Sequence, residues 1–182
     1  MTPDHPILVG IFEGFSWIRC EGKGSFMTSP AMKSFADERM AAGELHIVVD
    51  LQACTGMDST FMGTLAGIAS RLSANDQGGL QVAEPGDRNR RSLEDLGLDF
   101  LMEIDPKNAS WQPQADAIRT QLQPPQAIGK LASAQRTRHV LEAHQQLADL
   151  NESNANEFSD VLDQLEKELN EKEKPAPPKD PD

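Results

Sequence analysis

The run Leu45-His46-Ile47-Val48-Val49-Asp50-Leu51 constrains the fold more than any other segment of the chain. It is short, nearly continuous in apolar residues and rich in β-branched side chains. Such a run is typical of a central strand that is covered on both faces. We therefore expect a β-sheet with further elements packed against both of its sides.

Segments with strand and helix character alternate before and after this run. Short runs of β-branched and aromatic residues over 7–12 and 15–20, separated by Glu13-Gly14, predict a hairpin. Apolar residues near helical spacing predict a helix over 30–42, with Gly43 just beyond its end. The clearest helix begins near residue 59, and its apolar face is formed by Phe61, Leu65, Ile68 and Leu72.

Weaker patterns complete the first part of the chain. They predict a strand over 80–84, a helix over 87–96 with Asp87 as N-cap, an edge strand over 100–104 and a short helix over 114–122. Gly97 is placed to adopt the left-handed turn after the second of these elements, and Leu98 to fold back as an apolar clasp. Strands that alternate with helices predict an α/β fold, a small mixed β-sheet packed with helices.

The composition changes at Gln123-Pro124-Pro125, where we place a domain boundary. We interpret 1–123 as the α/β domain, 124–174 as a helical C-terminal extension and 175–182 as a disordered tail. A heptad seam from Leu141 to Leu169 predicts a coiled coil or a helical hairpin. One long helix and two helices hinged near 151–154 both fit, and the Asn and Ser residues there favour two. The extension either forms a homodimer or packs on the domain.

Charge narrows the classes of partner. The chain has 29 acidic and 17 basic residues and a net charge of −12. Without a basic stripe, neither nucleic acid nor an anionic membrane is an expected partner. Residues 1–6 lack the features of a signal peptide, and the longest uncharged, mainly apolar stretch, 59–70, has 12 residues, too few to cross a bilayer. We expect a soluble cytoplasmic protein with Cys20 and Cys54 as reduced thiols.

The segment that could carry chemistry is Asp58-Ser59-Thr60, where a loop after the central strand meets the strongest helix. The N-terminus of a helix favours negative charge through its free N–H groups and its dipole. A phosphate on Ser59 would add roughly −1.5 to −2 charges at a position that stabilises them. On spacing alone, a simpler interpretation is more common: Asp58 or Ser59 is only an N-cap.

The same stretch carries a resemblance to a known family. The run 47–59, the amphipathic helix after it, Gly78-Gly79 with a short strand, and Ser92-Leu93-Glu94-Asp95-Leu96-Gly97-Leu98 resemble the STAS domain of bacterial anti-sigma-factor antagonists. The resemblance covers about residues 7–120 and leaves out the C-terminal helices. Asp58-Ser59-Thr60 is similar to the family's D-S-S/T-G-L-G motif, whose first serine is a phosphoacceptor.

The resemblance implies a switch between a bound and a released state. The unphosphorylated domain binds an anti-sigma factor, which is also a serine kinase, and thereby releases a sigma factor. The phosphorylated domain lets the anti-sigma factor go, and a metal-dependent serine phosphatase reverses the modification. By position, Ser59 is the phosphoacceptor, and Asp58, Thr60, Phe61 and Met62 are the expected partner-binding residues. The resemblance implies no catalytic residue, no cofactor and no metal, hence a signalling protein of transcription regulation and not an enzyme.

The chain departs from the family motif directly after the acceptor. Where the family has Gly-Leu-Gly, this chain has Phe61-Met62-Gly63. If Phe61 packs in the domain's own core, little changes; if it is exposed, it alters the docking surface. The alternative is an unphosphorylated STAS scaffold subunit of a protein complex, with the C-terminal helices mediating assembly.

The histidines offer little support for an enzyme. His46 could be imagined as a base for Ser59, but the strand geometry separates them and no third orienting residue is evident. His139 and His144 are five residues apart, not the three or four that share a helix face, and no carboxylate completes a zinc pattern. We expect both to be solvated or to lie in the heptad seam.

Overall fold

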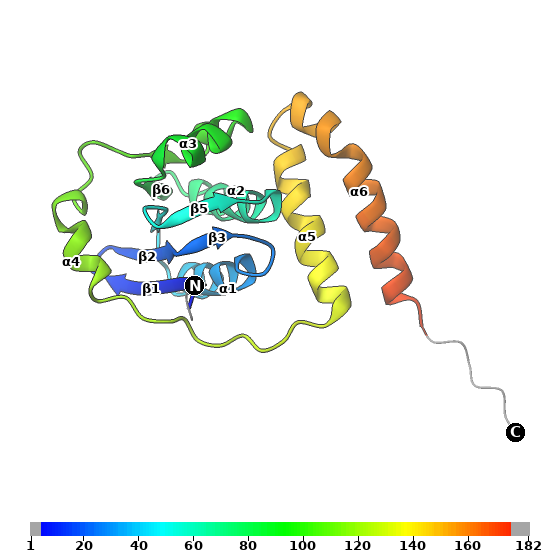
Figure 1. Ribbon diagram of the computed structural model, residues 1–182, viewed down its shortest axis with the longest axis horizontal. Helices are drawn as coiled ribbons and strands as arrows, with labels where there is room; N and C mark the ends of the chain where they lie inside the picture. The colour runs from blue at the N-terminus through cyan, green and yellow to red at the C-terminus, as the bar shows by residue number, and fades with distance from the viewer. Residues whose placement is uncertain (1–4, 176–182) are drawn as a thin grey trace, which may run out of the picture.

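A computed structural model describes residues 5–175 of the chain (Figure 1). Five strands form the main sheet in the order β1-β2-β4-β6-β7. The first pair is antiparallel and the other three pairs are parallel. The strands are β1 (Ile7–Phe12), β2 (Phe15–Cys20), β4 (His46–Asp50), β6 (Gly79–Ala83) and β7 (Glu103–Ile104).

The central strand β4 is covered on both faces, as its apolar run predicts. Ile47 and Val49 lie in the larger core, beneath α1 (Ser29–Ala41) and α2 (Ser59–Ser73). Val48 points to the other face and packs in a smaller cluster with Trp17, with Trp111 just before η2 (Gln112–Gln114), and with residues of α4 (Ala115–Arg119). The mixed α/β fold with a helical C-terminal portion is therefore confirmed.

A second, two-stranded sheet was not predicted. Strand β3 (Gly22–Gly24) pairs in parallel with β5 (Cys54–Met57), which leads directly into α2. Three glycines among these seven residues give a weak strand signal, because glycine is depleted in strands. The pairing is non-local, and it fixes the segment that precedes Ser59.

Two elements between residues 85 and 104 differ from the sequence expectations. Helix α3 (Gly86–Asp95) has Pro85 at its N-cap, so Asp87 lies in the first turn and is not the cap. Gly97 has the expected left-handed backbone, φ 78°, with Leu98 buried behind it. The turn continues as η1 (Leu98–Phe100), which leaves only β7 of the predicted edge strand.

The last helix before the boundary is also shorter than predicted. Helix α4 ends at Arg119, whereas the sequence suggested residue 122. The chain then turns back to the sheet, where Val9 and Gln123 exchange main-chain hydrogen bonds of 2.8 and 3.0 Å. This bridge ends the α/β part of the chain at the edge of β1.

The C-terminal portion forms two helices, α5 (Ser133–Ala148) and α6 (Glu152–Glu173). Asn151 caps α6 by accepting a 2.8 Å bond from the main-chain N–H of Asn154. The side-chain amide of Asn154 donates to the main-chain carbonyls of Leu96 and Leu147, both at 2.9 Å. The cluster of asparagines thus makes the hinge, and the alternative of one long helix is wrong.

Helix α5 packs against α2, and α6 packs along α5 (Figure 1). Leu147 of α5 and Phe158 of α6 belong to the same core as the apolar face of α2. The extension therefore packs on the domain of its own chain. The predicted tail, 175–182, lies outside the described residues apart from Pro175.

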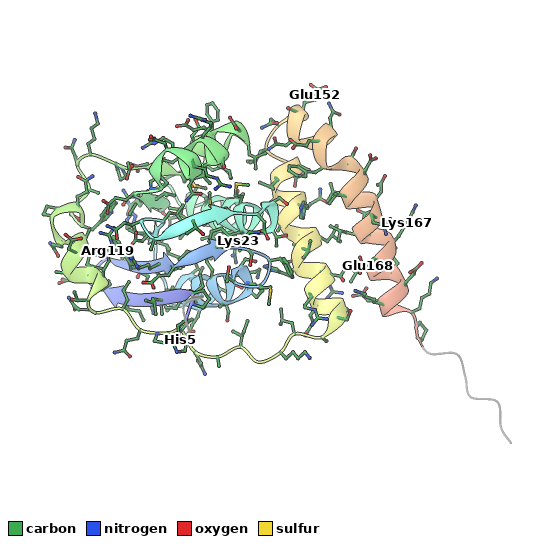
Figure 2. All side chains as sticks on the ribbon, in the orientation of Figure 1. His5, Lys23, Arg119, Glu152, Lys167 and Glu168 are labelled. Atoms are coloured by element: carbon green, nitrogen blue, oxygen red, sulfur yellow. The ribbon has the colours of Figure 1, made fainter. Side chains whose placement is uncertain are left out.

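None of the helices within 5–175 combines the length and the apolar character needed to cross a membrane. Figure 2 shows charged side chains such as Glu152, Lys167 and Glu168 along α6.

A candidate interaction site at the start of α2

Asp58 fixes the start of α2 from two sides. Its Oδ1 accepts a 2.9 Å bond from the main-chain N–H of Phe61, which makes it the N-cap, and its Oδ2 accepts a 2.8 Å bond from the N–H of Phe26. Its own N–H donates to the carbonyl of Gly24 at 2.9 Å. The simpler interpretation, an N-cap, holds for Asp58, and the cap also fastens the loop before α1.

Ser59 is the first residue of α2 and is half-buried. Its Oγ lies 2.8 Å from Nε2 of His144 on α5, 85 residues further along the chain. His144 Nδ1 lies 2.7 Å from the carbonyl oxygen of Val140, which can only accept, so Nδ1 carries the proton. Nε2 of the neutral ring is then an acceptor, and the Ser59 hydroxyl donates to it.

The other three predicted partner-binding residues are buried. Phe61 is fully buried, and a Cβ built on Gly24 would lie 2.9 Å from its ring. Thr60 is buried at the same turn, and Met62 belongs to the core that Leu147 and Phe158 complete. Phe61 thus packs in the domain's own core, the case in which the departure from the family motif changes little. The partner-binding role of Asp58, Thr60, Phe61 and Met62 stays a prediction.

Gly63 is where α5 comes closest to α2. A Cβ built on Gly63 would lie 2.1 Å from the main-chain oxygen of Ala143, so only glycine allows this approach. One turn later, a Cβ on Gly67 would meet only the side chain of Gln146, at 3.4 Å. The sequence analysis missed this contact, although two glycines four residues apart on one helix were an available signal.

A second histidine of α5 makes a contact with α1 that is equivalent to the contact of His144 with Ser59. His139 Nε2 lies 2.8 Å from Oγ of Ser29, the first residue of α1, and both side chains are buried. Burial lowers the pKa of His139, and Lys33 lowers it further, while Asp37 and Asp58 oppose the shift. Of the two expectations for these histidines, solvation is wrong, whereas His144 packs against Phe158 of α6 as a seam residue would, and each histidine meets the first hydroxyl of a different helix. His46, by contrast, is exposed at the amino end of β4.

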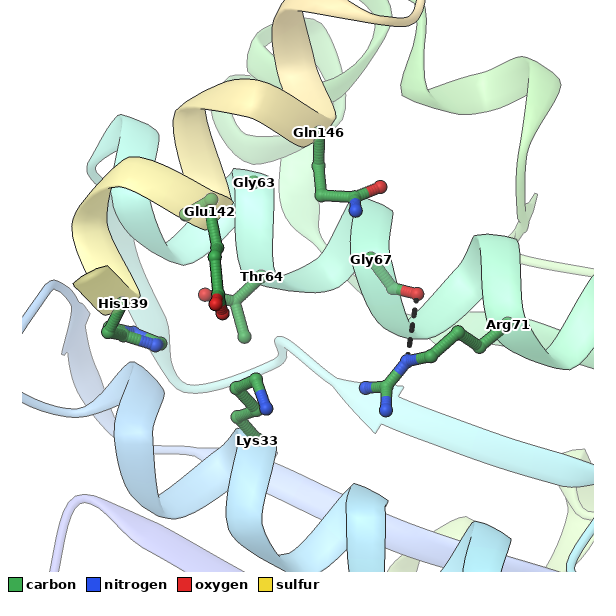
Figure 3. A pocket seen from close by; sticks show the side chains of 9 residues that line it. Lys33, Gly63, Thr64, Gly67, Arg71, His139, Glu142 and Gln146 are labelled. Carbon is green, nitrogen blue, oxygen red and sulfur yellow. Dashed lines mark hydrogen bonds between the residues drawn. The ribbon is translucent and has the colours of Figure 1, made fainter. Parts of the chain in front are cut away.

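A polar cavity of about 240 Å³ separates part of α5 from α1 and α2 (Figure 3). Lys33, Arg71, His139 and Glu142 contribute its titratable groups. Asp37 binds the two cations at its edge, at 2.7 Å from Lys33 Nζ and 2.7 Å from Arg71 Nη1. The interface between α5 and the domain is thus partly polar.

The two cysteines, Cys20 on β2 and Cys54 on β5, are unbridged and buried. The neighbouring Cys20 thiol lowers the pKa of Cys54, against the effect of burial. Within residues 5–175, no cluster of His, Cys, Asp and Glu side chains is arranged to hold a metal ion.

Comparisons with known proteins give one family. The family model described as the STAS domain matches residues 7–110. An anti-sigma factor antagonist from Mycobacterium paratuberculosis has 25% identity and a TM-score of 0.51, over 62% of this chain and 92% of that one. A Thermotoga maritima protein, with 18% identity and a TM-score of 0.50 over 62% and 91%, shares the fold. No curated protein matches the sequence.

Proposed function

The chain belongs to the STAS domain family, and from this premise we propose that it is a protein-interaction module switched by phosphorylation of Ser59. The proposal extends the family's relation to anti-sigma-factor antagonists. A partner anti-sigma factor with serine kinase activity would bind the unphosphorylated form, and a serine phosphatase would restore it. The role is regulatory and non-enzymatic.

The observation that carries the proposal is the position of the Ser59 hydroxyl. Asp58 already caps α2, so the Ser59 hydroxyl is not needed as a cap and instead donates to His144. A phosphoryl group there would lie at the positive end of a helix of 15 residues. The solved antagonist with 25% identity supports the same class of partner.

Phosphorylation transfers the γ-phosphoryl group of ATP to Ser59. An O–P bond forms at Oγ of Ser59, the bond between the β- and γ-phosphates of ATP breaks, and ADP leaves. The hydroxyl proton passes to a base of the kinase. The product oxygen can no longer donate to His144, so the hydrogen bond observed at 2.8 Å is lost.

Hydrolysis by a Ser59–His144 pair is a weaker candidate. The second ring nitrogen of His144 is held by a main-chain carbonyl, which fixes the tautomer but brings no carboxylate to stabilise an imidazolium.

One observation does favour the scaffold alternative: the Ser59 hydroxyl is hydrogen-bonded to the C-terminal extension of its own chain. In that case the site is silent and the helices serve assembly.

Mass spectrometry of the protein from its native cells tests the proposal. We expect phosphate on the peptide that contains Ser59 under at least one of two conditions, growth or stress. Ser59→Ala and Ser59→Asp variants should then retain different partners, because only the second carries negative charge at the site. An absence of phosphate under both conditions, with identical partners for the two variants, would favour the scaffold.

A further inference from the structure

Helix α5 covers the first turns of α1 and α2 at the same time. Figure 3 shows His139 and Glu142 of α5 facing Lys33 of α1 and Thr64 of α2 across the cavity. We propose that the surface made by Ser29, Ser59 and Gly63 is a docking site for a partner's α-helix, and that α5 occupies it in the resting chain. This inference rests on the proposed function, because the partner is the one that recognises Ser59.

The shape of the surface selects a helix with a small residue at its centre. The main-chain oxygen of Ala143 comes so close to Gly63 that one added carbon at Gly63 would collide with it. Approaches of this kind need small side chains on both helices. Gly63 on the domain and Ala143 on α5 meet this requirement, and a partner helix would need an equivalent of Ala143.

The polar groups of the surface add a second requirement. Ser29 and Ser59 begin their helices and present hydroxyl groups toward α5. His139 and His144 meet them at 2.8 Å each, and burial favours the uncharged form of His139 through its lowered pKa. Buried hydroxyls without a partner are costly. A helix that replaces α5 must therefore supply polar groups at both positions.

The covering helices are attached in a way that permits exchange. Residues 124–132, which join α5 to the domain, form neither helix nor strand. Part of the interface is the polar cavity, where Lys33, Arg71 and Glu142 stay close to water. Met62 of α2 shares one core cluster with Leu147 and Phe158 of the hairpin α5–α6, and the Asn154 side chain also donates to the Leu96 carbonyl. Departure of the hairpin breaks these contacts but leaves the chain intact, and it uncovers Ser59.

Phosphorylation and occupation by α5 exclude each other in this geometry. Ser59 Oγ and His144 Nε2 are already at hydrogen-bond distance, and the Phe158 ring packs edge to face with the imidazole, with ring centroids 5.6 Å apart. A phosphoryl group on Oγ would need the volume that the ring fills. A kinase can reach Ser59 only when α5 has moved, so α5 and the partner compete.

The first experiment nicks the full chain at a site-specific protease site placed within 124–132. We expect the nicked protein to co-elute as one species in size-exclusion chromatography at micromolar concentration, because the surface holds α5–α6 without the covalent link. Gly63→Ala should make the two parts separate. Gly67→Ala, one turn later, is the matched control and should co-elute, because its added carbon meets only a flexible side chain.

Both substitutions favour helix α2 itself, since alanine has a higher helix propensity than glycine. A difference in co-elution between the two nicked variants therefore reports on the packing of α5 against α2. Circular dichroism of both intact variants checks folding. Separation of the nicked parent protein, or co-elution of nicked Gly63→Ala, would overturn the proposal that the surface binds a helix.

The second experiment follows Ser59 phosphorylation in native cell extract with added ATP. Intact Ala143→Leu, which disturbs α5 and leaves the surface of the domain unchanged, should be phosphorylated at least several-fold faster than the parent, whereas Gly63→Ala, which closes the surface to α5 and to the partner's helix alike, should not. Equal rates in Ala143→Leu and the parent would overturn competition between α5 and the kinase. No phosphate in any of them would refute the proposed phosphorylation switch, while the nicking result decides the helix-docking surface independently.

Discussion

Asp58 shows how a residue singled out for function can have a structural task. Its two carboxylate oxygens are both used, one for the cap of α2 and one for the loop that contains Phe26. The carboxylate therefore positions Ser59 without touching its hydroxyl. The acidic residue before Ser59, the proposed phosphoacceptor, thus has a structural task in the fold itself.

Asp58→Ala should lower the free energy of unfolding by about 1–2 kcal/mol, because both main-chain N–H groups lose their acceptor. Urea unfolding at neutral pH measures the change. Asp58→Asn is the control, since asparagine caps helices about as well as aspartate. An alanine variant as stable as the parent would contradict the assignment of Asp58 as a cap.

Helix α4 is held to the sheet by a buried ion cluster. Asp50, at the end of β4, is fully buried and accepts bonds from Arg119 Nε at 2.8 Å and from Arg19 Nη1 at 2.9 Å. Arg119 lies on α4 at the edge of the sheet and also pairs with Glu84 (Figure 2). The ion cluster thus joins α4 to β4 in addition to the apolar contacts of Ala115 and Ile118.

Asp50→Asn should cost about 3–5 kcal/mol of unfolding free energy, because it leaves two guanidinium groups without their buried counter-charge. Glu84→Gln removes the more exposed partner of Arg119, and we expect a loss of at most about 1 kcal/mol. Similar losses in the two variants would contradict the central place of Asp50.

The stability provided by Asp50 should depend on pH. Burial would raise the pKa of its carboxyl, but hydrogen bonds from Arg119, Arg19 and the Gln52 N–H outweigh burial and hold the pKa below its usual value. A carboxyl with a lowered pKa stabilises the fold above its unfolded pKa of about 3.9, and this contribution declines as the pH falls below that value. The difference between parent and Asp50→Asn should therefore be full at pH 7 and smaller near pH 3, as measured by urea unfolding.

Across the whole molecule, the C-terminal helices complete the core of the α/β domain. Leu147 of α5 and Phe158 of α6 belong to the same core cluster as the apolar side of α2, which includes Met62 and Leu65. Residues 124–174 are thus an extension in sequence, but their packing is continuous with the domain. The possible homodimer through these helices stays a prediction.

Removal of 124–182 should uncover this apolar side and cause the truncated protein to associate with itself, because large exposed apolar patches promote association. Light scattering coupled to size-exclusion chromatography, on full-length and truncated protein, gives both masses. A dimeric full chain and a monomeric truncated one would instead show that the helices dimerise.

Much of the fold could be read from local patterns. The strand β4, the helix α2, the turn at Gly97 and the break between α5 and α6 each depend on residues within one or two turns of one another. The periods of strand and helix are local properties, so one segment suffices to reveal them. The same local patterns placed the start of a helix at Asp58-Ser59-Thr60, which the sequence analysis singled out as the candidate site.

What surrounds that start depends on contacts distant in sequence. The spacing of His139 and His144 argued against a shared role, yet α5 crosses two helices, and each histidine meets the first hydroxyl of one of them. The pairing of β3 with β5 and the joining of Asp50 to Arg119 are non-local in the same way. The sequence alone determined the segments with a strong period, such as β4, α2 and the two C-terminal helices, because hydrophobic period and turn chemistry act locally, and it did not reveal β3 and β5. Only the tertiary structure decided that α5 covers Ser59, because the fit of Gly63 to Ala143 exists only when the two helices are packed together.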